Sequence, residues 1–137
     1  MEKHLLLTDD QFEMQLESTT IDPELFSHEA HIRLAWIHIR KYGLEQAIEN
    51  VQQQIKQFAD SQGAFDKFNK TLTVAAVRAV YHFMLKSRSD TFRGFIEEFP
   101  QLKTHFKDLM ACHYGFDIYQ SQLAKTEYLE PDLIPFD

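Results

Sequence analysis

Hydrophobic residues recur every three or four positions through most of the chain, which is the period of an amphipathic α-helix. The clearest stripe predicts a helix from Leu44 to about Phe58. The segment before it, capped by Ser27 and ending near Tyr42, is predicted to be another helix. Gly43 is a typical helix end, and so short a connection predicts that the two helices are antiparallel neighbours.

Helix start signals and breakers divide the rest of the chain. They predict helices over residues 8–18, 89–99, 101–113 and 121–128, with Ser89 and Asp90 capping the second of these. The segment from Thr71 to about Lys86 is apolar nearly all round and predicts a central helix covered on several sides. Residues 130–136 contain two prolines and are expected to be extended over the bundle. The sequence therefore predicts an all-α bundle of about six helices, forming a single domain over residues 1–137.

Composition narrows the class of protein. The chain has 137 residues, and its four Gly and four Pro are fewer than usual, which favours long helices. A net charge of −7 makes nucleic acid an unfavourable partner. A lone Cys rules out an intramolecular disulfide framework, and no apolar run approaches the roughly 20 residues of a membrane span. The N-terminus lacks a signal-peptide pattern, so we expect a cytoplasmic protein.

Two histidines on the helix after Ser27 are the candidate metal ligands. His28 and His31 are three residues apart, so they lie one above the other and could share one metal ion. Imidazole suits iron and zinc, and a third ligand would come from another helix. His38 lies about 10 Å further along the axis, outside the same coordination shell. The alternative is that all three histidines only pack or cap within the helix.

A second group of residues could bind an anion. Lys70 and Thr71 open the apolar helix, where free N–H groups attract negative charge, although they could simply begin and cap that helix. Arg78 could hold a substrate carboxylate in bidentate fashion, or it could pair with a neighbouring helix. Cys112 is expected to be a buried structural residue.

The segment from Phe26 to Trp36 resembles the opening signature of a family of small bacterial helical proteins. That signature reads Phe, Ser or Thr, His, two variable residues, His, and then an aliphatic-Arg-aliphatic-Ala-Trp run. Two further blocks are similar to residues 68–73 and 131–133. The resemblance implies an all-helical fold with His28 and His31 as a signature pair, but it supplies no activity. The second block has a His where this chain has Asn69. Asn69 would then be a weaker oxygen ligand to the metal, or a carboxylate such as Glu24 or Asp66 would take its place.

Three functions are therefore open. The first is a mononuclear iron or zinc protein, an enzyme or a metal binder, with His28, His31 and Asn69 as ligands. The second is a metal-free enzyme or binder of a small acidic or aromatic ligand, with Arg78, Thr71 or Lys70 binding its charge and His31 as the catalytic acid or base. The third is a helical protein-interaction module in which the histidines merely pack.

Overall fold

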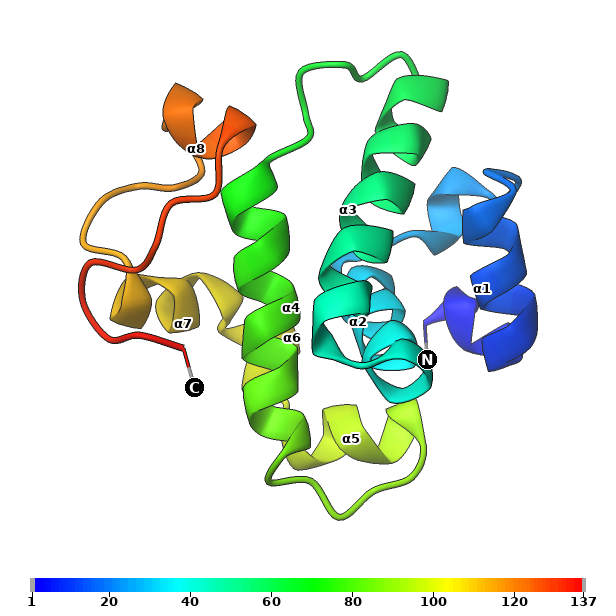
Figure 1. The fold of residues 1–137 in the computed structure, drawn as a ribbon. Coiled ribbons are helices and arrows are strands. Elements are labelled where there is room, and N and C mark those ends of the chain that lie inside the picture. The colour runs from blue at the N-terminus through cyan, green and yellow to red at the C-terminus, as the bar shows by residue number, and fades with distance from the viewer. Residues whose placement is uncertain (1, 137) are drawn as a thin grey trace. The chain divides into compact units, whose positions relative to one another are not determined.

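The computed structural model describes residues 2–136, and its described part is all-helical (Figure 1). It contains eight α-helices, two 3₁₀-helices and no strand within the described residues. The all-α prediction is thus confirmed. The chain divides into two compact units, Met1–Phe68 and Asn69–Asp137, and each is described by itself below. The prediction of one domain over residues 1–137 stays a prediction.

The N-terminal unit begins with two short helical elements before its long helices. The 3₁₀-helix η1 spans Lys3–Leu6 and α1 spans Asp9–Glu17. Thr8 caps α1 in a reciprocal capping box with Gln11, which explains why the helix starts there. The 3₁₀-helix η2 spans Pro23–Leu25, with Pro at a first position that needs no N–H donor.

Helices α2 and α3 form the main pair of the N-terminal unit. Helix α2 spans His28–Tyr42 and α3 spans Leu44–Ser61, and the two pack closely against each other. Gly43 joins them with a φ of 83°, which a residue with a side chain adopts at a cost. Their apolar faces and that of α1 form the core, which includes Phe12, Leu16, Ile32, Leu34, Ala47 and Val51. The predicted antiparallel pair is confirmed.

The C-terminal unit is built on α4, Lys70–Met84, followed by shorter helices: α5 over Phe92–Glu98, α6 over Gln101–Thr104, α7 over Phe106–His113 and α8 over Gln122–Thr126. Besides shifts of up to three residues at other helix ends, two features differ from the sequence prediction. The helix expected over residues 101–113 is broken at His105, whose φ of −133° and ψ of 36° are not helical. Thr91, not Ser89 or Asp90, caps α5 by accepting from the Gly94 N–H.

The C-terminal segment is extended, as predicted. Leu133 N donates to His113 O over 3.0 Å, so the segment lies along the end of α7. Asp132 also accepts from the Gly115 N–H over 2.8 Å. Cys112 is exposed, so the expectation of a buried cysteine was wrong. No helix within the described residues has the length and apolar character needed to cross a membrane.

Candidate functional site

The N-terminal unit contains a polar cavity of about 460 Å³, a size typical of small-molecule sites. Three helices line it. Glu13 and Glu17 come from α1, His38 and Tyr42 from α2, and five amide side chains from α3, namely Gln46, Asn50, Gln53, Gln54 and Gln57. Each helix contributes residues at three- or four-residue spacing, so each presents one polar stripe. The regular spacing of side chains along the three helices therefore places these polar residues together around the cavity.

Glu13 is a carboxylate of the cavity that accepts hydrogen bonds from two side chains. Its side chain is 11% exposed, and it accepts from Lys41 Nζ over 2.6 Å and from the Tyr42 hydroxyl over 2.5 Å. Burial raises the pKa of Glu13, but the two hydrogen bonds outweigh it and leave the pKa below its ordinary value. The hydrogen bond to Glu13 also raises the pKa of Tyr42. Near neutral pH the cavity thus holds an ionised Glu13 and a protonated Tyr42.

His38 is fully buried at the same cavity, with only 1% of its surface exposed. Asn50 Nδ2 lies 3.3 Å from His38 Nδ1, and Asn50 Oδ1 accepts from Gln46 over 2.8 Å. The amide therefore presents its donor to His38, Nδ1 accepts, and the ring proton is on Nε2. Burial lowers the pKa of His38, which keeps the ring neutral.

Two buried polar atoms of these lining residues have no hydrogen-bond partner in the described structure. They are His38 Nε2, a donor, and Gln54 Oε1, an acceptor. Buried polar atoms in proteins are nearly always hydrogen-bonded, because leaving one unpaired costs roughly 1–3 kcal/mol. A molecule that both accepts and donates hydrogen bonds would satisfy this pair.

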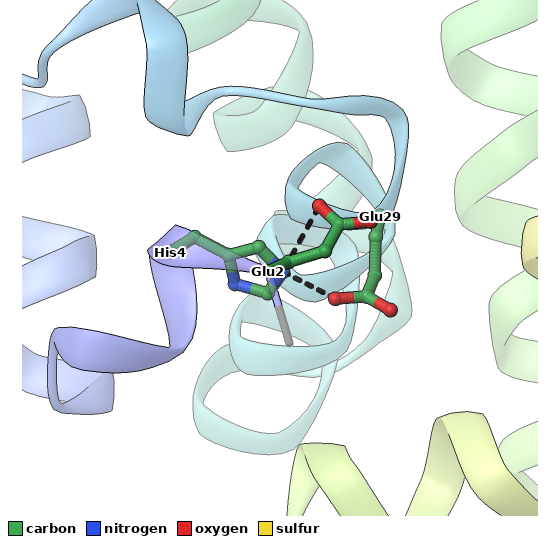
Figure 2. A group of neighbouring side chains, drawn as sticks. All are labelled: Glu2, His4 and Glu29. Carbon is green, nitrogen blue, oxygen red and sulfur yellow. Dashed lines mark hydrogen bonds and ion pairs between the residues drawn. The ribbon is translucent and has the colours of Figure 1, made fainter.

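A second cluster joins the N-terminal segment to α2 (Figure 2). One ligand atom each from Glu2, His4 and Glu29 lies within 4.8 Å of the others, a spacing compatible with one metal ion. His4 Nε2 lies 2.5 Å from Glu29 Oε2 and 3.8 Å from Glu2 Oε1. Ser27, the cap of α2, also donates to Glu2. One imidazole and two carboxylates form a donor set that zinc, iron and manganese accept.

Arg33 fixes which ring nitrogen of His4 accepts a hydrogen bond. It is 4% exposed, and its Nη1 lies 2.7 Å from the His4 carbonyl and 3.3 Å from His4 Nδ1. Arginine only donates, so Nδ1 accepts and the ring proton lies on Nε2, facing Glu29. Metal binding through Nε2 would require the opposite tautomer. The cluster as it stands is a buried hydrogen-bonded network that fixes the N-terminal segment.

The two histidines predicted as metal ligands lie at the start of α2. His28 is its exposed first residue. His31 is half-buried, stacks on Phe26 at 3.8 Å between ring centroids, and places Nδ1 2.7 Å from the Ser27 carbonyl. Burial lowers the pKa of His31, so the ring is neutral and Nδ1–H donates. Neither histidine belongs to the three-residue ligand set found among the described residues.

The residues predicted around the start of α4 mostly hold the C-terminal unit together. Asn69 Oδ1 accepts from Leu72 N over 2.9 Å and Nδ2 donates to Ile118 O over 2.8 Å, so both ends of the amide are in use. The Thr71 hydroxyl is likewise occupied, by backbone groups near α8. Lys70 is the half-buried first residue of α4. Arg78 lies over the ring of Tyr128, with 5.9 Å from Cζ to the centroid.

Sequence reasoning did not find the polar cavity, although one signal was present. The amides of α3 recur at helical spacing beside its apolar stripe, which marks a second ordered face. His4, Glu13 and Arg33 gave no such signal, because their partners lie 24–29 residues away in sequence.

Comparisons with known proteins identify no relative. No protein-family model matches the chain, and no curated protein or solved structure is significantly similar to it. The resemblance to a bacterial helical family stays a prediction.

Proposed function

We propose that this protein binds a small polyhydroxylated molecule, neutral or cationic, in the cavity between α1, α2 and α3. The observation that carries the proposal is the pair of unpartnered buried atoms, His38 Nε2 and Gln54 Oε1, on residues that line the cavity. A hydroxyl group accepts from an N–H and donates to a carbonyl oxygen, so it suits both atoms. Sugars and amino sugars carry several such groups.

The charge of the lining supports the rest of this assignment. Glu13 and Glu17 are the charged residues that line the cavity, and no Lys or Arg does. Lys41 is engaged by Glu13. An anionic ligand would meet repulsion there, whereas an ammonium group would meet attraction. The amide side chains supply both donors and acceptors for the remaining hydroxyl groups.

Thermal unfolding with three sugars tests this assignment. Glucosamine, glucose and glucose 6-phosphate share a ring and differ in charge. We expect the melting temperature to rise with glucosamine concentration, to rise less with glucose and to be unchanged by glucose 6-phosphate, because only a bound ligand stabilises the folded state.

Two matched variants distinguish glucosamine binding in the cavity from unspecific stabilisation of the protein by sugars. Gln54→Leu removes the unpartnered acceptor at similar size and is expected to abolish the glucosamine effect. Gln122→Leu makes the same change at an exposed position on α8 and should leave the effect intact. Equal shifts for all three sugars, or an unchanged shift in Gln54→Leu, would refute the proposal.

A divalent cation at Glu2, His4 and Glu29 is the second candidate function. The spacing of the three ligand atoms favours it. It ranks second because binding at Nε2 would cost the Glu29 hydrogen bond and turn Nδ1–H toward the Arg33 guanidinium. This second candidate keeps iron or zinc, the metals predicted from the sequence, but assigns them different ligands.

Elemental analysis of untagged protein, purified without chelator, tests the cation. If the site binds metal, about one equivalent of zinc or iron should be present and Glu29→Gln should reduce it at least tenfold. His28→Ala is the matched variant for the pair predicted from sequence, and it should not change the content. Metal lost in His28→Ala but kept in Glu29→Gln would instead support the His28 and His31 site.

A further inference from the structure

The C-terminal unit contains a cavity of its own, of about 290 Å³, between α7 and the loop after it. Lys107 and Met110 line it from one face of α7, since residues three apart lie on the same side of a helix. Three aromatic side chains also line it, Tyr114 at the end of α7 and Phe116 and Tyr119 in the loop. We call it the aromatic cavity. A cavity of about 150 Å³ holds one benzene molecule, so this one has room for a ring with a polar substituent.

Hydrogen bonds to distant segments hold the aromatic cavity in shape. Asn69 Nδ2 donates to the carbonyl of Ile118, another lining residue, over 2.8 Å, which ties the loop to the start of α4. The Tyr114 hydroxyl donates to the Leu129 carbonyl over 2.8 Å. Both anchors are present without a ligand. The cavity is therefore preformed, and a ligand does not have to order it.

The inner surface of the aromatic cavity is apolar. Met110, Tyr114 and Ile118 are buried and form its floor. Phe116 is 39% exposed, and its ring meets that of Tyr114 edge-on, with 5.7 Å between the centroids. A second ring placed against Phe116 would remove apolar surface from water and form a further aromatic contact. The cavity thus favours an aromatic ligand.

Two exposed residues of opposite charge line the same cavity, and both contact Tyr119. Lys107 Nζ lies 5.0 Å from the centroid of the Tyr119 ring, and this contact leaves its N–H groups for another acceptor. Asp117 Oδ1 accepts from Tyr119 N over 2.9 Å, which leaves Oδ2 for another donor. Neither residue forms an ion pair with any part of the chain that the structure describes. A ligand with one positive and one negative group would find a partner for each.

We infer that the aromatic cavity binds a free aromatic amino acid, with its ring against Phe116, its carboxylate at Lys107 and its ammonium group at Asp117. The contacts of both charged residues with Tyr119 place their charges beside one residue, as the two neighbouring charges of an amino acid require. The site lies within the C-terminal unit, so it does not depend on the sugar site of the N-terminal unit.

NMR of the methionine methyl groups tests this site where it lies, because Met110 is buried at the floor of the cavity. The chain has four methionines, and Met110→Leu assigns the signal by its loss. L-Phenylalanine is the probe, and its ring should shift the Met110 signal saturably. 3-Phenylpropionate lacks the ammonium group and L-phenylalaninamide lacks the carboxylate. We expect each of them to bind at least roughly tenfold more weakly, since each loses one charge-assisted hydrogen bond.

Two variants correspond to these two analogues. Lys107→Gln should weaken the binding of L-phenylalanine roughly tenfold and leave that of L-phenylalaninamide unchanged. Asp117→Asn should have the same effect on L-phenylalanine and leave 3-phenylpropionate unchanged, and it keeps the oxygen that accepts from Tyr119 N. Asp108→Asn is the control, because Asp108 is an exposed residue of α7 that does not line the cavity.

Three results would overturn the inference. The first is a Met110 shift that stays linear up to the solubility of L-phenylalanine, or that Lys107→Gln and Asp117→Asn leave unaltered. The second is binding of L-phenylalaninamide or 3-phenylpropionate as tightly as L-phenylalanine, which would contradict a free amino acid. The third is a loss in Asp108→Asn as large as that in Asp117→Asn, which would mean that only the net charge matters.

Discussion

Replacing Arg33 with Met is expected to lower the free energy of unfolding by about 3 kcal/mol. Arg33 is 4% exposed and donates to Asp9 over 2.8 Å and to the carbonyls of His4 and Leu7. Met fills a similar volume but donates nothing, so it leaves those acceptors unpaired. It also removes the positive charge beside His4, which in turn contacts Glu29. This single change thus breaks hydrogen bonds to segments 24–29 residues away in sequence.

Denaturant unfolding followed by the fluorescence of Trp36 measures this loss, because the chain's single tryptophan is buried on the same helix as Arg33. Arg88→Met is the control, since Arg88 is exposed and belongs to the other unit. A loss below about 1 kcal/mol, the range of surface ion pairs, would show that the network does not anchor the N-terminal segment.

Replacing Thr71 with Val is expected to cost about 2 kcal/mol, the second largest effect. Val has nearly the same shape, so the change removes the hydroxyl with little change in packing. It leaves Glu127 O and Leu129 N without their partner.

Hydrogen exchange of the Leu129 amide reports this effect directly, since that N–H donates to Thr71. We expect its protection to fall in Thr71→Val and not in Thr104→Val, whose exposed hydroxyl bonds only locally. Unchanged protection of Leu129 in Thr71→Val would mean that another contact holds the Tyr128 segment.

Local signals were enough to predict most of the fold. The cap residues Thr8 and Ser27, the turn residue Gly43 and the apolar stripes are all read from residues near each other in sequence, and the structure confirms the helices they mark. The break at His105 was missed because no Gly or Pro marks it. Cys112 was misplaced because burial depends on which face of a short helix the core covers.

The candidate sites were less accessible to sequence reasoning. The His28 and His31 pair was visible because helical spacing brings the residues together, yet the ligand set found in the described structure uses Glu2, His4 and Glu29 instead. That set joins residues 25 positions apart, which no local period reveals. Arg78 stood out as a charge on an apolar helix, and its role as a ligand-binding residue stays a prediction, but only the fold shows that Tyr128 lies beside it.

The ring N–H of His38 provides the most direct test of the polar cavity. Its Nε2 proton can be observed by NMR because the group is buried, and it is assigned by its loss in His38→Gln. The account predicts that glucosamine moves this signal saturably to lower field, as a new hydrogen bond forms, and that Gln54→Leu abolishes the response. A signal that glucosamine leaves unmoved, while the protein is otherwise folded, would contradict a ligand at His38.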